Sequence, residues 1–196
     1  MLVGINSVFI FSGAIFAEGL DDSDDQVPVI LNSVLGIMNV LGMAISIKLV
    51  GKYGRRSLYM ISFSLVFAAM LAFAIIGYAG ASGSWAQKIL ILVWPIAFNV
   101  GIGSLTYPYM SEILPDRALG IAVFLNWITS FLTIQFFLDI SNAIEIHGLF
   151  LIHTAVALIA ILVTKFFVLE TKGKTKTQII MEYCNIKPSA DLEKSV

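Results

Sequence analysis

Long apolar stretches separated by short polar segments make up most of the chain. The apolar runs are continuous rather than alternating, and most reach the roughly 20 residues that a helix needs to cross a bilayer. They predict an all-α membrane protein, with a bundle of six transmembrane helices over residues 1–169 and an amphipathic or partly disordered cytoplasmic tail over 170–196. The first span is short, so we expect its beginning to be missing. The six spans lie near residues 2–19, 28–50, 58–80, 88–110, 119–140 and 148–169.

The composition favours a membrane protein over a soluble one. Of the 196 residues, 58% are hydrophobic and 13% are charged, whereas an ordinary soluble domain is about 45–50% apolar and about 25% charged. The mean hydropathy is +0.91. A net charge of −1 gives no reason to expect nucleic acid as a partner. The single cysteine, Cys184, cannot form an internal disulfide.

Charge predicts the orientation of the spans, because loops rich in Lys and Arg resist translocation and stay in the cytoplasm. One set of loops contains Lys48, Lys52, Arg55, Arg56, Arg117, Lys165, Lys172, Lys174 and Lys176. The opposite set contains Asp21, Asp22, Asp24, Asp25, Asp139 and Glu145, with only Lys88 as a basic residue. The first set is therefore expected to be cytoplasmic. Six spans then place both termini in the cytoplasm, and we expect the membrane to be the plasma membrane.

No motif in the chain predicts an enzyme, a metal site or a cofactor. The acidic run Asp21–Asp25 lacks the glycine and the distal glutamate of a calcium-binding loop, so we interpret it as a solvated extracellular turn. His147 and His153 lack the His-Glu-x-x-His spacing or the cysteine partner typical of zinc sites. The sequence also shows no nucleophile–base order and no phosphate loop.

Uncharged polar residues within the spans are the candidate ligands for a substrate. A polar group in lipid costs on the order of several kcal/mol unless it has a hydrogen-bond partner. Amides offer both donors and acceptors, which suits a neutral polyol, and aromatic faces can stack on a sugar ring. The alternative is that each amide only joins two helices by a hydrogen bond. The residues are Asn6, Asn39, Asn99, Tyr107, Asn126, Trp127 and Gln135.

The fourth span contains Gly101 and Gly103 directly after Asn99, followed by Pro108. Two glycines and a proline in the middle of a span loosen the helix and let backbone groups line a cavity. The alternative is a proline kink that serves packing only. Either way, we expect this helix to bend, which makes it a plausible gate.

Charged residues at the cytoplasmic ends of the spans are candidates for an inner gate. Glu112 can pair with Arg55, Arg56 or Arg117, and Glu170 can do the same. Exposed pairs of this kind contribute only about 0–1 kcal/mol each. Their expected role is to bias an equilibrium between two conformations. The alternative is a set of solvated loops with no role in switching.

Five short motifs in order resemble the sugar porter family of the major facilitator superfamily, in its C-terminal six-helix half. Gly4-Ile5-Asn6 resembles the family's "GIN" in helix 7, and Gly54-Arg55-Arg56 its "GRR" loop between helices 8 and 9. Ser111-Glu112-Ile113 resembles the segment that closes helix 10, and Asn126-Trp127 the "NW" of helix 11. Glu170-Thr171-Lys172-Gly173 resembles "PETKG" after helix 12. The match covers nearly the whole chain.

The resemblance implies a carrier with its substrate midway between two six-helix halves. It implies that Asn6, Asn39 and Asn126 bind sugar hydroxyls, that Asn99 contacts substrate, and that Tyr107 and Trp127 stack on the ring. Arg55, Arg56, Glu112, Arg117 and Glu170 would form the inner latch.

The expected function is transport of a hexose-type monosaccharide by alternating access, with the lipid bilayer, the sugar and an N-terminal six-helix half as partners. We expect the chain to be part of a twelve-helix carrier. The alternatives are a half that pairs with itself and a sensor or regulator that kept the fold without transporting. The chain departs from the family pattern at Gly51, at Leu169 in place of a proline, and at Tyr107 in place of a tryptophan.

Overall fold

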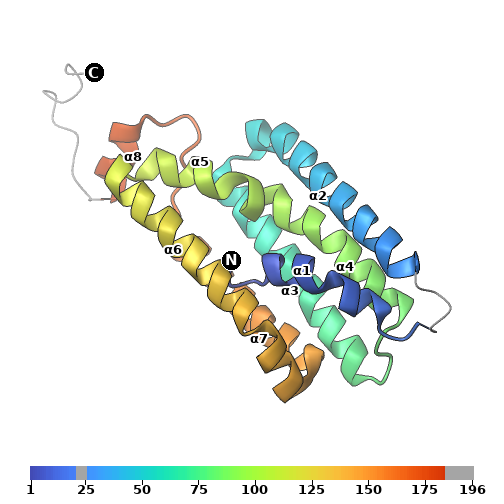
Figure 1. Cartoon of the computed structure of the whole chain (residues 1–196). Coiled ribbons are helices and arrows are strands. Elements are labelled where there is room, and N and C mark those ends of the chain that lie inside the picture. Colours follow the sequence, from blue (N-terminus) through green and yellow to red (C-terminus); the bar gives the residue numbers. More distant parts are fainter. Residues whose placement is uncertain (21–25, 184–196) are drawn as a thin grey trace, which may run out of the picture.

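The computed structural model describes residues 1–20 and 26–183, so the acidic run Asp21–Asp25 and Cys184 lie outside the described residues. The described part folds into helices without a strand (Figure 1), which confirms the prediction of an all-α membrane fold. The elements are α1 (Ile5–Ala17), α2 (Gln26–Tyr53), α3 (Arg55–Tyr78), α4 (Trp85–Phe98), η1 (Asn99–Gly103), α5 (Ser104–Ile113), α6 (Asp116–Gln135), α7 (Phe137–Phe167) and α8 (Lys176–Tyr183).

Five of the described helical segments are long and apolar enough to cross a membrane. The third of them, Trp85–Ile113, runs through α4, η1 and α5 without a break. The sixth apolar helix, α1, has 13 residues and is therefore about 20 Å long, less than the roughly 30 Å of a bilayer core. The expectation of a short first span is thus met by a helix that is too short to cross alone. It begins after Gly4, whose φ of 78° interrupts regular helix.

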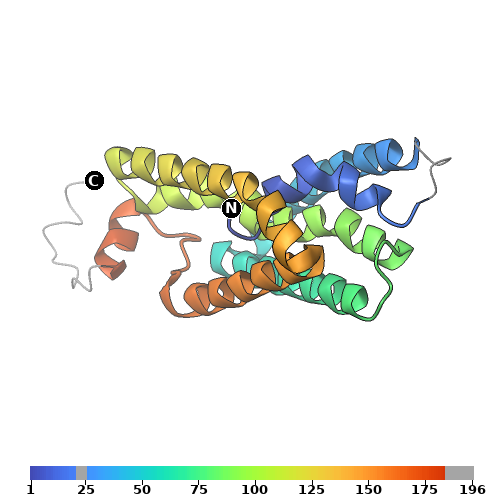
Figure 2. The ribbon, with the colours of Figure 1, turned by 60° about the horizontal axis from the view of Figure 1, so that its bottom comes forward.

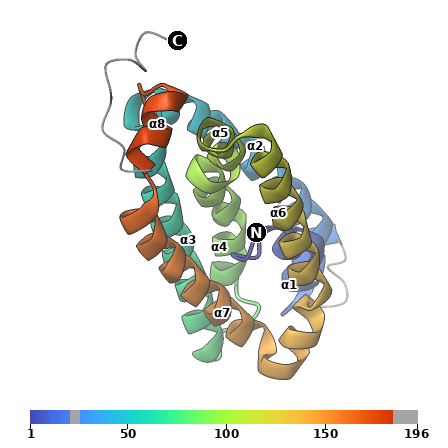
Figure 3. The ribbon, with the colours of Figure 1, turned by 90° about the vertical axis from the view of Figure 1, so that its left-hand side faces the viewer.

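The last two predicted spans need a correction of their boundaries. The sequence predicted spans at 119–140 and 148–169, with a loop between them. In the structure α6 ends at Gln135, and α7 begins at Phe137 and includes most of the expected loop. Only Ile144 and Glu145 leave helical geometry, and the chain reverses at this point (Figure 3). Apolar residues on both sides of the turn continue as helix because lipid leaves backbone groups no other partner.

Helix α4 lies in the middle of the bundle, between α2 and α3, and α7 packs along α3 (Figures 2 and 3). Small residues permit this close packing. A Cβ atom on Gly101 would lie 2.3 Å from the carbonyl oxygen of Leu58, and one on Gly42 would lie 2.9 Å from Cα of Ile96. The absence of side chains at these two positions therefore brings the α4–η1–α5 segment against both neighbouring helices.

The polar tail contains a helix that docks on the bundle. Ile179 of α8 is buried, and the hydroxyls of Tyr183 and Tyr109 lie 2.7 Å apart, which links α8 to α5. Tyr109 also donates to the carbonyl of Leu169 at 3.2 Å. The start of the tail is thus held against the end of α5, at the end of the bundle where the α2–α3 turn also lies (Figure 1).

Replacing Gly101 with Ala should destabilise the bundle. The added methyl group has to displace the backbone of α3, and overpacking of this kind costs about 1–3 kcal/mol. The matched control is Gly120→Ala, because no atom lies within 4 Å of a Cβ at that helical position. We expect a lower midpoint of thermal unfolding in detergent for Gly101→Ala and no decrease for Gly120→Ala. Equal midpoints for both variants would contradict the packing described.

Candidate substrate site and inner latch

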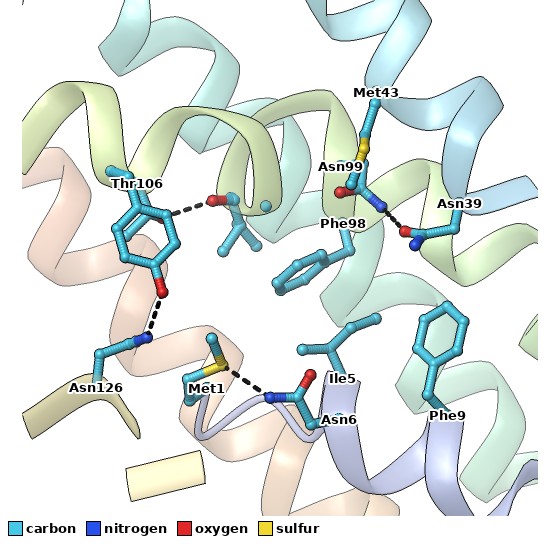
Figure 4. Close-up of a pocket in the computed structure, with 13 residues that line it drawn as sticks. Met1, Ile5, Asn6, Phe9, Asn39, Met43, Phe98, Asn99, Thr106 and Asn126 are labelled. Atoms are coloured by element: carbon cyan, nitrogen blue, oxygen red, sulfur yellow. Dashed lines mark hydrogen bonds between the residues drawn. The ribbon is translucent and has the colours of Figure 1, made fainter. Parts of the chain in front are cut away.

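A cavity of about 310 Å³ lies among α1, α2, α6 and the continuous α4–η1–α5 segment, and each of these contributes polar side chains to it (Figure 4). Of the candidate ligands predicted from the sequence, Asn6, Asn39, Asn99, Tyr107 and Asn126 line it. Around them lie mainly apolar residues and one further hydroxyl: Met1, Ile5, Phe9, Met43, Phe98, Ile102, Gly103 and Thr106. The structure therefore brings five side chains that are up to 120 positions apart in sequence to one place.

Asn99 and Asn39 form an amide pair on one wall of the cavity. The Nδ2 of Asn99 donates to the Oδ1 of Asn39, which joins η1 to α2, and it also donates to the carbonyl of Pro95 at 2.9 Å. Asn99 is 2% exposed, whereas Asn39 is half-buried. The Nδ2 group of Asn39 is thus the part of this pair that can reach a ligand, while Asn99 holds it in place.

The opposite wall consists of two further polar pairs. The Nδ2 of Asn126 donates to the phenolic oxygen of Tyr107 at 3.1 Å, between α6 and α5. The Nδ2 of Asn6 donates to the hydroxyl of Ser130 at 2.6 Å, between α1 and α6. Each amide retains its carbonyl oxygen as an acceptor. The pairs orient these side chains before any ligand arrives, which lowers the entropic cost of binding.

Trp127, which the sequence also predicted as a ligand, lies outside the cavity. It is 57% exposed and does not line the cavity. Neighbouring positions on an α-helix point about 100° apart, so Trp127 faces away when Asn126 faces inward. Gln135, at the last turn of α6, is also absent from the cavity wall.

Ser130 and Thr106 belong to the cavity region, although nothing in the sequence alone distinguishes them from other hydroxyl residues. Ser130 lies four residues after Asn126 and is buried, and Thr106 donates to the carbonyl of Ile102 at 2.5 Å. The i, i+4 spacing on a helix would have placed Ser130 on the same face as Asn126. Hydroxyls are so common in membrane helices that this spacing is a weak signal without the structure.

A π-helix replaces the predicted loosened helix at the fourth span. The turn at η1 covers Asn99 to Gly103, beside the cavity. A Cβ on Gly103 would lie 2.3 Å from the Oδ1 of Asn99. π-Helices are rare, occur mostly as single turns inside α-helices, and lie frequently at functional sites. The two glycines of this segment therefore leave room for different neighbours: Gly101 for the backbone of α3, and Gly103 for the amide of Asn99.

Four of the five predicted latch residues meet where α3 begins and where α5 and α7 end, and we call Arg55, Arg56, Glu112 and Glu170 the latch cluster. The sequence suggested that Glu170 pairs with guanidinium groups, but among the described residues it forms no such pair. Its Oε1 accepts from the backbone N–H of Arg55 at 2.9 Å and its Oε2 from that of Arg56 at 3.1 Å. The carboxylate thus caps the N-terminus of α3, where free N–H groups and the helix dipole attract an anion.

The two arginine side chains have separate partners. The Nη2 of Arg55 lies 2.7 Å from the Oε1 of Glu112, which joins α3 to α5. The Nη2 of Arg56 donates to the carbonyl of Lys165 at 2.6 Å, near the end of α7. Arg117 is exposed in the first turn of α6 and forms no ion pair with a described residue. The structure therefore does not bring Arg117 into the cluster.

The two histidines are used for packing and hydrogen bonding within the described part of the chain. The Nε2 of His147 lies 3.0 Å from the hydroxyl of Ser82, and the Nδ1 of His153 lies 2.8 Å from the carbonyl oxygen of Leu2. No group of three or more His, Cys, Asp or Glu side chains that could hold a metal ion occurs among the described residues. These contacts connect α7 to the segment before α1 and to the α3–α4 loop.

Glu170 should give the latch cluster a dependence on pH. Burial by itself raises the pKa of the Glu170 carboxyl, but the backbone N–H groups of Lys172, Arg55 and Arg56 lower this pKa below its ordinary value. The folded chain therefore binds this proton less readily than the unfolded chain. The stabilisation is present above the ordinary pKa of Glu, about 4.3, and is lost as the pH falls through the lower pKa of the folded state.

We therefore expect Glu170→Gln to lower the unfolding midpoint in detergent at neutral pH. The difference from the unchanged chain should disappear as the pH falls through the folded pKa of Glu170. Glu182→Gln is the control, because Glu182 pairs only with the exposed Lys174 and should have a small effect. A constant difference at every pH would show that the carboxylate charge at the start of α3 does not stabilise the fold.

Comparison with known proteins agrees with this architecture. The profile of the family described as "Sugar (and other) transporter" matches residues 1–183. The facilitated trehalose transporter of Bombyx mori is 27% identical, over 92% of this chain and 37% of its own length. The membrane transporter D1 of Leishmania donovani is 30% identical, over 90% of this chain and 34% of its own length.

A solved structure shows the same arrangement of helices. The major facilitator superfamily proton:xylose symporter XylE, bound to 6-bromo-6-deoxy-D-glucose, superposes with a TM-score of 0.82 at 25% identity. The alignment covers 93% of this chain and 40% of that chain, so the present chain spans well under half the length of these relatives. Since the family profile covers nearly all of the described residues, the chain belongs to the sugar transporter family of the major facilitator superfamily.

Proposed function

We propose that this chain forms the C-terminal six-helix half of a carrier that moves a hexose-type monosaccharide across the membrane by alternating access. The observation that carries the proposal is the convergence of four amides and one phenol, from separate elements, on one cavity. Four of these groups lie in helices long enough to span a membrane, and Asn6 lies in the shorter apolar helix α1; an unsatisfied polar group is costly at membrane depth. A ligand rich in hydroxyls would satisfy the donors and acceptors that they leave free.

The chemistry of the cavity suits a neutral sugar. Apart from the phenol of Tyr107, none of the lining side chains can ionise. Amides can both donate to and accept from hydroxyls, while Phe9 and Phe98 provide aromatic faces for the apolar side of a ring. The names of the relatives, a trehalose transporter and a proton:xylose symporter, point to the same class of substrate. The preference for a hexose is our inference from the resemblance and from this lining.

The second half of the carrier would close the cavity. Tyr107 is 38% exposed, and Asn39 and Asn126 are half-buried. Polar side chains at membrane depth face a protein interior or a water-filled space rather than lipid. We infer that the face on which these residues lie packs against an N-terminal six-helix unit across a central pathway, as in carriers built from two repeats. Residues 1–169 would then form one structural half, and 170–196 its cytoplasmic tail.

The latch cluster would hold one conformation of the carrier closed. It joins α3, α5 and α7 through one ion pair and several charge-assisted hydrogen bonds. It lies at the end that carries most of the Lys and Arg residues, which the positive-inside rule places in the cytoplasm. With both termini also cytoplasmic, a plasma membrane carrier would use this cluster to close its inner side. Sugar binding would shift the equilibrium by favouring one conformation over the other.

Reconstitution of the full-length polypeptide into liposomes tests the function directly. We expect uptake of radiolabelled glucose that saturates and that unlabelled monosaccharides inhibit. Saturable binding without uptake would instead identify a sensor of the same fold. If the polypeptide neither binds nor takes up glucose, xylose or trehalose, the proposal is refuted. Cross-linking between two copies of this chain, without a second half, would identify a carrier that pairs with itself.

Asn126→Ala and Asn6→Ala should each weaken sugar binding without preventing insertion into the membrane. A lost hydrogen bond contributes about 0.5–1.5 kcal/mol, so we expect Kd to rise about two- to tenfold. Asn32→Ala is the control, since Asn32 is an exposed amide on α2 that does not line the cavity. Equilibrium binding of labelled sugar to membranes measures the change. An unchanged Kd in both variants would remove these amides from the list of ligands.

A further inference from the structure

Two serines outside the cavity make contact with the backbone of the π-helix and of the end of α4 directly before it. The hydroxyl of Ser62, on α3, donates to the carbonyl of Ala97 at 2.6 Å and lies 3.1 Å from that of Phe98. It also accepts the backbone N–H of Ile102 at 3.3 Å. The hydroxyl of Ser46, on α2, donates to the carbonyl of Val100 at 3.1 Å. Both serines are fully buried, at 0% and 1% exposure.

These contacts answer a problem that a π-turn creates. A wider turn leaves backbone carbonyls without their usual helical donor, and lipid has no water to replace it. Hydroxyls from two neighbouring helices supply that donor from opposite sides. Gly101 permits the approach on the α3 side, because any side chain there would collide with the carbonyl of Leu58. The π-turn is therefore stabilised by side chains of the neighbouring helices α2 and α3.

The π-turn sets which residues of α5 face the cavity. The lining positions on this segment recur at every fourth residue: Phe98 and Asn99, Ile102 and Gly103, Thr106 and Tyr107. A regular α-helix advances about 100° per residue, so eight residues overshoot two full turns by about 80°. The wider turn absorbs that overshoot. In an α-helical register, with α4 fixed between α2 and α3, Leu105 and Thr106 would take the places of Thr106 and Tyr107.

We infer that Ser62 and Ser46 are positioning residues that lock the π register and thereby turn Tyr107 toward the cavity. Ser62 is the stronger of the two, because it contacts three backbone groups and Ser46 contacts one. Neither serine lines the cavity. Their effect on sugar affinity rests on the proposed function, whereas their effect on the register of α5 does not.

Cysteine labelling of the full-length polypeptide in membranes tests the register without a sugar. The single cysteine of the chain, Cys184, is first replaced by serine, as is any other cysteine of the longer polypeptide. Leu105→Cys then reports the register, since Leu105 is 5% exposed and would turn into the cavity in an α-helix. Ile91→Cys reports general loosening, because Ile91 is buried in α4 before the π-turn. A small water-soluble maleimide is the probe.

Adding Ser62→Ala should raise labelling at position 105 by more than about threefold, the size expected when a hydrogen-bonded state loses part of its support. Labelling at position 91 should not change. Ser46→Ala should also raise labelling at position 105, but less strongly. It replaces Ser62→Ala in this test if Ser62→Ala fails to reach the membrane. The matched control is Ser12→Ala, because Ser12 is a buried serine that bonds only the carbonyl of Phe9 in its own helix.

Two results would overturn the inference. Labelling at 105 could stay constant in both serine variants, or it could rise together with labelling at 91, which would mean that the serines serve stability alone. Sugar binding is measured on the same membranes, where Ser62→Ala should raise Kd and Ser12→Ala should not. If no variant binds sugar, the proposed function fails, but the ratio of labelling at 105 and 91 still decides whether the serines fix the register.

Discussion

The lack of water inside a membrane is the constraint on which the rest of this structure depends. Each polar group at depth needs a protein partner, because none is available from the solvent. The buried hydroxyls of Ser46 and Ser62 find theirs on a neighbouring helix backbone, and Asn99 finds one on α2. The interhelical contacts that position the cavity are therefore the same contacts that make its polar residues tolerable in lipid. The need of each buried polar group for a protein partner therefore explains both the packing of the helices and the polar lining of the cavity.

The chain uses two kinds of polar contact at two depths. Neutral amide and hydroxyl pairs surround the cavity, where a ligand's hydroxyls can replace or extend them at small electrostatic cost. Charged groups gather at the basic end, where water reduces the cost of leaving them unpaired. In the carrier that we propose, this division would let contacts form and break in both places, since a buried ion pair beside the substrate would be costly to break.

The latch cluster shows how a motif can act through its backbone. Gly54 has a φ of 78°, and a Cβ at this position would lie 2.5 Å from Oε2 of Glu170. The glycine thus makes room for the carboxylate at the free N–H groups of α3. The two arginines that follow are then left to reach Glu112 on α5 and the end of α7. The glycine and the glutamate hold the helix end, while the arginines join it to its neighbours.

Hydropathy and charge patterns were enough to predict the helical class, most of the spans and the residues with a reason to be polar in lipid. The amides of Asn6, Asn39, Asn99 and Asn126 stand out in sequence because a polar group at membrane depth is costly. Only the tertiary structure decided in which direction these side chains point and which partners they have. It turned Asn126 inward and hence Trp127 outward, and it gave Glu170 backbone partners that no side-chain pairing rule suggests. It also set the π register through Ser62, 35 and 36 positions before the carbonyls that it contacts, and through Ser46, 54 positions before the carbonyl that it binds, because helix rotation depends on neighbours that local sequence does not specify.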